Sequence, residues 1–177
     1  MSNYPFISAN GARGKQNAVR TGIQYALDKG YQYAMTLDGD GQHPPEFIPE
    51  MFGLLRSNEA DIVIGSRFLD EEKPLNARMA GSRMLTRSIA QKTGVVIKDP
   101  TSGMHAYSHI VMEDIDGGDL FCAEPDFLAA EIVRGRRVKE IQVQMRERLS
   151  GKSEYVSEYS GLKRPGCRVS GTIVPRQ

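Results

Sequence analysis

The sequence lacks the features that mark secreted, membrane-spanning or nucleic-acid-binding proteins. It has only two cysteines, Cys122 and Cys167, at no metal-like spacing, which argues against a disulfide framework and favours a reducing cytoplasm. No apolar run approaches the length of a membrane span, and the first residues lack the basic and apolar regions of a signal peptide. The net charge is +1, so any binding of phosphate must come from local clusters.

The order of the expected elements predicts an α/β protein with a mostly parallel sheet. The chain of 177 residues suits one domain with a substantial core. Hydrophobic periodicity predicts helices over residues 16–29, 46–56, 78–92 and 125–134, and strands over residues 33–37, 61–65, 104–107 and 138–145. Periodicity is lost beyond Glu154, so residues 154–177 are expected to form a poorly ordered tail.

The motif Asp38-Gly39-Asp40-Gly41-Gln42 follows one of these expected strands. Two carboxylates one residue apart at a strand end can point into the same cleft. Mg²⁺ is usually held by one or two carboxylates together with substrate phosphates. The competing interpretation is an ordinary turn, because Asp and Gly are common turn residues. An EF-hand loop is excluded, since its sixth position would be His43 and its twelfth Pro49.

Three further polar clusters fall at expected strand ends or loops, where ligands of open α/β sheets collect. They are Gly65-Ser66-Arg67, Asp99-Pro100-Thr101-Ser102-Gly103 and residues 146–153. The basic side chains that could contact phosphate are Arg67, Arg78, Arg83, Arg148 and Lys152. Each taken alone also fits a solvated surface charge, but Arg67 and Arg148 follow apolar strands beside glycines.

Two other patterns carry less information. The segment from Asn10 to Lys15 resembles a phosphate loop before a helix, but it does not have Walker A spacing, and a simple helix-entry turn is the favoured interpretation. His105 and His109 are four residues apart without an acidic partner that would complete a zinc site. They are interpreted as structural or surface residues.

Several motifs in order resemble family 2 glycosyltransferases, and within them the polyprenyl-phosphate branch similar to dolichyl-phosphate mannose synthase. The resemblance covers about residues 8–153. It is carried by Asn10-x-x-x-Gly14-Lys15-x-x-Ala18-Val19-Arg20-x-Gly22, Leu37-Asp38-Gly39-Asp40-Gly41-Gln42-His43, Ile64-Gly65-Ser66-Arg67-Phe68, Asp99-Pro100-Thr101-Ser102-Gly103 and Met145-Arg146-Glu147-Arg148-x-x-Gly151-x-Ser153. Five ordered motifs are far more specific than any one of them.

The resemblance implies a GT-A-like (Rossmann-like) fold and inverting transfer of a sugar from a nucleotide-sugar, UDP- or GDP-linked. It implies that Asp38 and Asp40 hold Mg²⁺ or Mn²⁺ against the donor diphosphate and that Gln42 joins the metal sphere. The metal would neutralise charge on the leaving nucleoside diphosphate.

The same resemblance implies that the acceptor is a polyprenyl phosphate, whose ionised phosphate needs no strong general base. Residues matching phosphate-binding or other substrate-binding positions are Arg67, Arg78, Ser82, Arg148 and Lys15. The residues assigned to catalysis are Asp40, Glu124 and Arg148. For the acid near the acceptor, Glu124 and Asp126 both remain open, and a helix N-terminal acid is the competing explanation.

Relative to the family pattern, this sequence starts late. Relatives begin with a strand and an Asn-Glu pair, followed by a strand ending in Asp-Asp-Gly-Ser, and that half binds the base and ribose. Residues 1–153 are therefore expected to form a partial, N-terminally truncated GT-A domain with an exposed sheet edge and an incomplete nucleotide pocket. His105 also stands where relatives usually have Arg.

The predicted function is a metal-dependent inverting glycosyltransferase that acts on a polyprenyl phosphate. Two alternatives remain: the same fold with a saccharide acceptor, which would need a true general base, and a non-catalytic truncated remnant. No nucleic-acid partner is expected. The expected location is the cytoplasm, peripheral at the inner face of the membrane where the acceptor lies.

Overall fold

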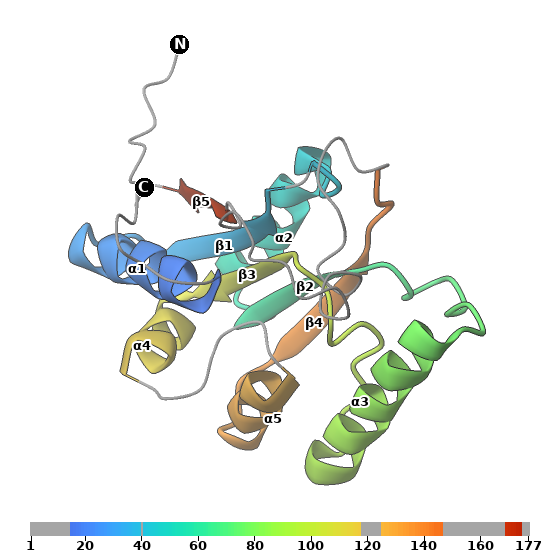
Figure 1. Cartoon of the computed structure of the whole chain (residues 1–177). Helices are drawn as coiled ribbons and strands as arrows, with labels where there is room; N and C mark the ends of the chain where they lie inside the picture. The colour runs from blue at the N-terminus through green and yellow to red at the C-terminus, as the bar shows by residue number, and fades with distance from the viewer. Residues whose placement is uncertain (1–14, 40, 118–124, 147–168, 175–177) are drawn as a thin grey trace, which may run out of the picture.

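The computed structural model describes residues 15–39, 41–117, 125–146 and 169–174 (Figure 1). The side chains of residues 15, 77, 78 and 169–174 are not described. The helices are α1 (Lys15–Asp28), the 3₁₀ turn η1 (Pro45–Phe47), α2 (Ile48–Arg56), α3 (Ala77–Thr93), α4 (His109–Gly117) and α5 (Pro125–Val133). The strands are β1 (Tyr33–Asp38), β2 (Ile62–Ser66), β3 (His105–Ser108), β4 (Val138–Gln142) and β5 (Val169–Val174).

The strands form one sheet in the order β4-β2-β3-β1-β5. β2 and β4 pair in parallel, whereas β3 is antiparallel to both β1 and β2 and β5 is antiparallel to β1. Consequently β1, β2 and β4 all point the same way. Their carboxyl ends lie at the same end of the sheet. The chain returns to this end after α3, and β3 starts there.

The helices cover both faces of this sheet, as Figure 1 shows. One core cluster joins Ala34, Ile64 and Tyr107 of the sheet to residues of α1, α4 and α5. The other joins Met35 and Val63 to residues of α2. Because successive strand side chains point to opposite faces, the buried strands β1 and β2 contribute to both clusters.

Helix α3 has clear local start and stop signals. The Asn76 side chain accepts a hydrogen bond from the backbone N–H of Met79 at 2.9 Å, which caps the N-terminus. Gly94 follows the last turn with φ of 74°, a left-handed conformation that favours glycine. These signals place the helix where the sequence predicted it, within one residue at each end.

The predicted α/β fold, a sheet flanked by helices, is confirmed, but the description of the sheet as mostly parallel is not exact. Among the described strands one pairing is parallel and three are antiparallel. The physical reason is that β3 inserts between β1 and β2 and separates strands that share one direction. The short helix α4 and the strand β5 are additions that the periodicity analysis did not predict.

The exposed edge expected of a truncated sheet does not lie at β1, which pairs over six positions, from Tyr33↔Val174 to Asp38↔Val169, with β5. This strand comes from within residues 154–177, where a poorly ordered tail was expected; residues 154–168 and 175–177 lie outside the described part of the chain. None of the described helices is long and apolar enough to cross a membrane.

Candidate functional site

The candidate site lies at the end of the sheet that holds the carboxyl ends of β1, β2 and β4. Asp38 from β1, Ser66 from β2 and Gln142 from β4 lie at this end. The loop Asp99–Gly103 reaches the same end because β3 starts there. Thus three of the four polar clusters found in the sequence meet here, together with Arg146, the first residue of the fourth. The rest of that cluster, including the predicted catalytic residue Arg148 and Lys152, lies outside the described residues.

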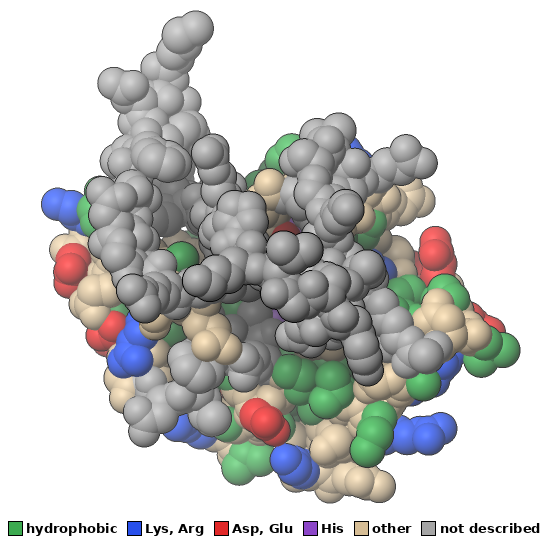
Figure 2. Space-filling model, in the orientation of Figure 1, with side chains coloured by type: hydrophobic (Ala, Val, Ile, Leu, Met, Phe, Trp, Pro, Cys, Tyr) green, Lys and Arg blue, Asp and Glu red, His purple; other side chains and the backbone are tan. Residues whose placement is uncertain are grey.

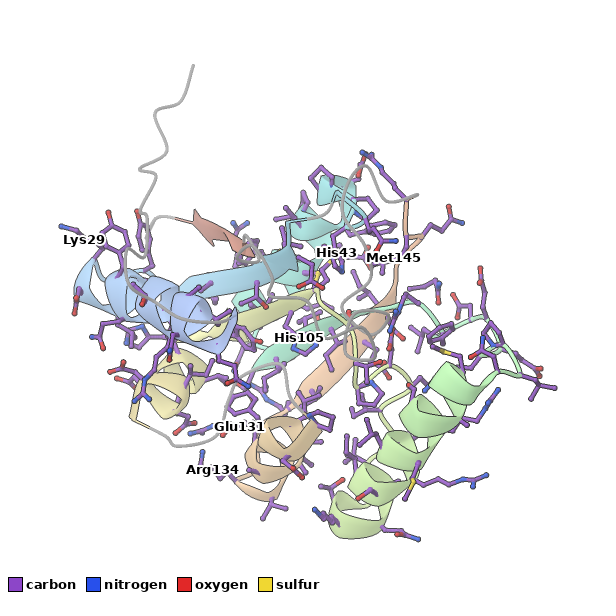
Figure 3. The ribbon with its side chains drawn as sticks, viewed as in Figure 1. Lys29, His43, His105, Glu131, Arg134 and Met145 are labelled. Atoms are coloured by element: carbon purple, nitrogen blue, oxygen red, sulfur yellow. The ribbon has the colours of Figure 1, made fainter. Side chains whose placement is uncertain are left out.

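Asp38 is packed directly against Gly103. A Cβ atom built on Gly103 would lie 2.1 Å from Oδ2 and 2.6 Å from Cγ of Asp38, and 2.9 Å from Cε1 of His43. Such distances are far inside van der Waals contact, so only a glycine leaves room for the Asp38 carboxylate in this position. Figure 3 places His43 near this end of the sheet, with Met145 from the segment that follows β4.

The loop after β1 is tied to the segment after β4. The backbone N–H of Arg146 donates to the carbonyl of Gln42 at 2.9 Å, and the Gln42 amide nitrogen donates to the Arg146 carbonyl at 3.4 Å. The Arg146 guanidinium also pairs with Glu46 in η1, the 3₁₀ turn that follows the loop after β1. These contacts bring Gln42 and Arg146 together across more than one hundred residues of sequence.

Asp38 and Gln42 supply oxygen donors of the type that hard divalent cations prefer. Asp38 is half-buried at the strand end, and Gly103 approaches its carboxylate closely. The third predicted metal ligand, Asp40, lies outside the described residues. Within the described ranges, no group of three His, Cys, Asp or Glu side chains is placed to hold a metal. The donor set that is described fits Mg²⁺ or Mn²⁺ in chemistry but does not complete a site.

Arg67 forms a two-point salt bridge with Asp99. Nε of Arg67 donates to Oδ2 and Nη2 donates to Oδ1, both at 2.7 Å, and the Arg67 backbone N–H adds a third bond to Oδ2 at 3.1 Å. The Asp99 side chain is fully buried, whereas that of Arg67 is 22% exposed. Burial alone would raise the pKa of Asp99, but the hydrogen bonds and charge of Arg67 outweigh it and hold this pKa below its ordinary value.

Glu140 of β4 fixes the start of the Asp99–Gly103 loop. Its carboxylate accepts hydrogen bonds from the backbone N–H groups of Lys98 at 2.6 Å and Asp99 at 2.8 Å. Further along, Ser102 Oγ donates to the carbonyl of Gly65 at 2.6 Å. The loop is therefore held against the ends of two strands, which makes its position a fixed part of the site.

Of the predicted substrate-binding residues, Ser82 is placed most clearly. It is buried in α3, and its hydroxyl accepts a hydrogen bond from Nζ of Lys73 at 2.8 Å. Arg67 is engaged with Asp99 as described above, and a contact from it to phosphate stays a prediction. The side chains of Lys15 and Arg78 lie outside the described residues, although their backbones belong to α1 and α3.

The two candidates for an acid near the acceptor differ in what the structure says of them. Glu124 lies outside the described residues. Asp126, in the first turn of α5, is 78% exposed and pairs with Lys92 at 3.5 Å. This is the environment of a helix N-terminal acid in solvent, not of a base held in a dry site.

The histidines agree with the structural role predicted for them. His105 is fully buried in β3, and its Nδ1 lies 3.2 Å from Oη of Tyr107, whose ring it meets edge-on. His109 begins α4, and its Nδ1 lies 3.1 Å from the Tyr31 carbonyl. In Figure 3, His105 lies on the sheet, away from Glu131 and Arg134, which are labelled beside α5.

A second charged cluster lies near the opposite end of the sheet, where β4 begins and β3 ends. Glu131 is buried and pairs with Arg134 at 2.6 Å and with Arg136 at 3.6 Å. Arg136 also binds Asp114 at 2.7 Å. Burial, with a smaller contribution from Asp114, raises the pKa of Glu131 despite its bond to Arg134. This cluster ties α4 to α5 and belongs to the support of the fold, not to the candidate site.

Three participants were not singled out by the sequence. Gly103 and His43 were part of quoted motifs, but nothing in a linear sequence shows that Gly103 must leave room for Asp38. Lys73 stands in a loop of mixed charge without any motif, and only its contact with Ser82 reveals it. On the face shown in Figure 2, basic and acidic side chains are interspersed among the described residues. The described part of this face therefore has no patch of one charge sign that would mark a further binding site.

The features above define an α/β protein with polar side chains gathered at the carboxyl ends of its parallel strands, the place where open α/β sheets bind ligands. The chain matches the model of glycosyl transferase family 2 over residues 5–116, more than half of its length. It belongs to this family, which confirms the resemblance inferred from its motifs.

Individual relatives support the branch as well. Polyprenol monophosphomannose synthase of Mycolicibacterium smegmatis is 30% identical over 151 residues, covering 81% of this chain and 55% of that protein. Undecaprenyl-phosphate mannosyltransferase of Micrococcus luteus is 28% identical over 160 residues, with 80% and 60% covered. Dolichol-phosphate mannosyltransferase of Saccharomyces cerevisiae is 30% identical over 125 residues, with 67% and 43% covered. The chain spans about half the length of these relatives.

Proposed function

We propose that this chain carries the metal- and phosphate-binding part of an inverting glycosyltransferase that moves a sugar from a nucleotide-sugar, UDP- or GDP-linked, to a polyprenyl phosphate. The observation that carries the proposal is the placement of Asp38 against Gly103 at the strand edge that the loop of Asp99 also reaches. The names of the relatives, which specify polyprenol, undecaprenyl-phosphate and dolichol-phosphate, support a lipid phosphate as the acceptor.

In this proposal Asp38, Asp40 and Gln42 hold Mg²⁺ or Mn²⁺. The bound cation would supply charge neutralisation for the departing nucleoside diphosphate. The chain's own contribution is to orient these donors: Gly103 leaves space for the Asp38 carboxylate, and the Gln42–Arg146 bonds set the direction of the Gln42 side chain.

Two of the residues proposed to hold phosphate groups have described side chains: Arg67 lies against the Asp99 loop and Ser82 lies in α3. Arg67 is oriented by its two-point bond to Asp99, so its guanidinium enters the site in a fixed position. Ser82 of α3 accepts a hydrogen bond from Lys73 in the loop before this helix. Arg78, Lys15 and Arg148 complete the proposed set by resemblance. Pre-oriented cations of this kind bind phosphate without the cost of ordering long side chains at each binding event.

A phosphate acceptor is favoured over a saccharide acceptor by the environment of Asp126. A hydroxyl acceptor needs a base that removes its proton, whereas Asp126 is exposed and paired with Lys92. A phosphate is already ionised and needs no such base. Replacing Asp126 and Glu124 by alanine should therefore leave transfer to a polyprenyl phosphate within a few-fold of the parent rate, while a saccharide acceptor would lose orders of magnitude.

The proposal is tested first by calorimetry of the chain with Mn²⁺ and either UDP- or GDP-linked sugars. Binding of one nucleotide-sugar that depends on Mn²⁺, and that Asp38→Asn abolishes, is the expected result. Glu50→Gln, an exposed acid on α2, serves as the matched control and should bind like the parent. If no nucleotide-sugar binds in the presence of Mn²⁺, the chain is a non-catalytic remnant by this criterion, and the enzyme proposal fails for it.

A further inference from the structure

A pocket of about 510 Å³ lies between the loop that follows β2 and one side of α3. Its lining includes four basic residues and two acidic ones, which are Lys73, Arg83, Arg87, Lys98, Glu71 and Glu72. None of the four basic side chains lies within 4.0 Å of a carboxylate oxygen in the part of the chain that is described. Among the described residues, these four cations therefore form no ion pair, and they outnumber the two acids of the lining.

Lys73 is held against α3 by its side chain. Its ammonium group donates to Ser82 Oγ at 2.8 Å and to Thr86 Oγ1 at 3.2 Å, two hydroxyls one turn apart on α3. Partial burial lowers its pKa, an effect that the charges of Asp99 and Glu140 partly oppose. An ammonium that is half-buried against neutral hydroxyls is a site where an arriving anion gains more than it would at the surface.

The backbone of the loop that carries Lys73 is also bonded to α3. Nη2 of Arg83 donates to the carbonyls of Lys73 at 2.6 Å and Pro74 at 3.0 Å. This holds the main chain of Lys73 over the helix independently of its side chain. The pocket is thus preorganised, and an anion would not have to order the loop before it binds.

The pocket also has an apolar component. The ring of Phe68 has the Arg67 guanidinium 5.1 Å from its centroid and the Lys73 ammonium 5.7 Å from it, which connects this pocket to the Arg67–Asp99 pair. Leu75, at the rim, is 95% exposed. An isoprenoid chain attached to a bound phosphate would cover the Leu75 side chain and remove its apolar surface from water, which is favourable.

We propose that Lys73 is a phosphate-binding residue and that its pocket takes a phosphate monoester carrying an apolar chain. The inference rests on the proposed function, because it assigns to the lipid phosphate acceptor a cation that no motif of the sequence marks. Ser82 then acts as a pair with Lys73: its hydroxyl oxygen accepts from the ammonium, which leaves its proton to donate to a phosphate oxygen.

The test measures binding of three probes to the chain: farnesyl phosphate, farnesol and inorganic phosphate. Farnesyl phosphate should bind best, inorganic phosphate should compete with it, and farnesol should bind at least tenfold more weakly. Lys73→Met keeps the apolar stem but removes the charge, and it should weaken farnesyl phosphate by about tenfold or more, the range expected for losing hydrogen bonds to a charged group. Lys73→Arg should retain most of the binding.

The matched control is Lys92→Met, which removes an exposed lysine of α3 that pairs with Asp126 outside the pocket; it should not change the affinity. Thermal melting of each variant establishes that it is folded. The inference is overturned if folded Lys73→Met binds farnesyl phosphate like the parent, or if farnesol binds as well as farnesyl phosphate.

The two proposals can fail separately. Loss of Mn²⁺-dependent nucleotide binding, with farnesyl phosphate binding that still depends on Lys73, would reject the enzyme proposal and leave this site standing. Intact nucleotide binding with no effect of Lys73→Met on farnesyl phosphate would reject the site alone.

Discussion

A Cβ atom on Gly103 would lie 2.1 Å from Oδ2 of Asp38. The two residues come from neighbouring antiparallel segments, Asp38 at the end of β1 and Gly103 just before β3. The missing side chain of one residue is therefore the space that the carboxylate of the other occupies. This makes Gly103 a positioning residue for the acid on which the proposed metal site depends.

Gly103→Ala should force Asp38 or the backbone to move. We expect a loss of about 1–3 kcal/mol in the free energy of unfolding, as for overpacked sites, together with weaker Mn²⁺-dependent nucleotide binding. Gly53→Ala in α2 is the control, because nothing lies within 4 Å of its added Cβ, and in a helix alanine is favoured over glycine by about 1 kcal/mol. Urea unfolding of both variants gives the comparison. Equal stability of the two variants would contradict the proposed close contact.

Asp99→Asn should be one of the more destabilising single changes in the loop. It removes a buried charge that binds Arg67 at two points, and breaking a buried pair typically costs about 3–5 kcal/mol. Because the Arg67 side chain is 22% exposed, a cost near the lower end, about 3 kcal/mol, is expected.

The control for that change is an exposed ion pair. Lys139→Met breaks the contact with Glu59, in which both side chains are about half exposed, and should cost far less, because exposed ion pairs contribute little to stability. Chemical denaturation at pH 7 measures both. A cost for Asp99→Asn no greater than for Lys139→Met would show that the Arg67 bond contributes little.

The same pair predicts how stability depends on pH. The pKa of Asp99 in the folded chain is below its ordinary value, so its contribution is fully present above the unfolded pKa of about 3.9 and is lost as pH falls through the folded pKa. The stability difference between the parent and Asp99→Asn should be constant from about pH 7 to 5 and shrink below about pH 4. A difference that shrinks near pH 6 would point to another group.

Removal of residues 169–177 should open the edge of β1. β5 pairs with this strand over six positions, and an unpaired edge favours association with other chains. We expect a lower melting temperature and concentration-dependent self-association by light scattering. Removal of residues 175–177 alone keeps β5 and is the control. Identical melting and scattering of the two truncations would show that β5 does not protect the edge in solution.

Much of the fold and of the site follows from local sequence. The apolar residues of β1 and β2 predict buried strands whatever their neighbours, because period and composition are properties of the segment itself. The order of motifs around Asp38, Arg67 and Asp99 likewise identified the family, since each motif is short and contiguous. For the same reason α3 was predicted within one residue at each end: its cap Asn76 and its stop Gly94 act locally.

Strand order and pairing were decided only in three dimensions. The antiparallel position of β3 between β1 and β2, and the covering of β1 by β5, depend on contacts between segments far apart in the chain. No local pattern encodes them. The same holds for the contact of Gly103 with Asp38 and for that of Lys73 with Ser82. The sequence by itself determined the fold class, the family and the candidate residues for the chemistry. The tertiary structure decided which of the described candidates meet, because distance across a sheet is set by packing and not by separation along the chain.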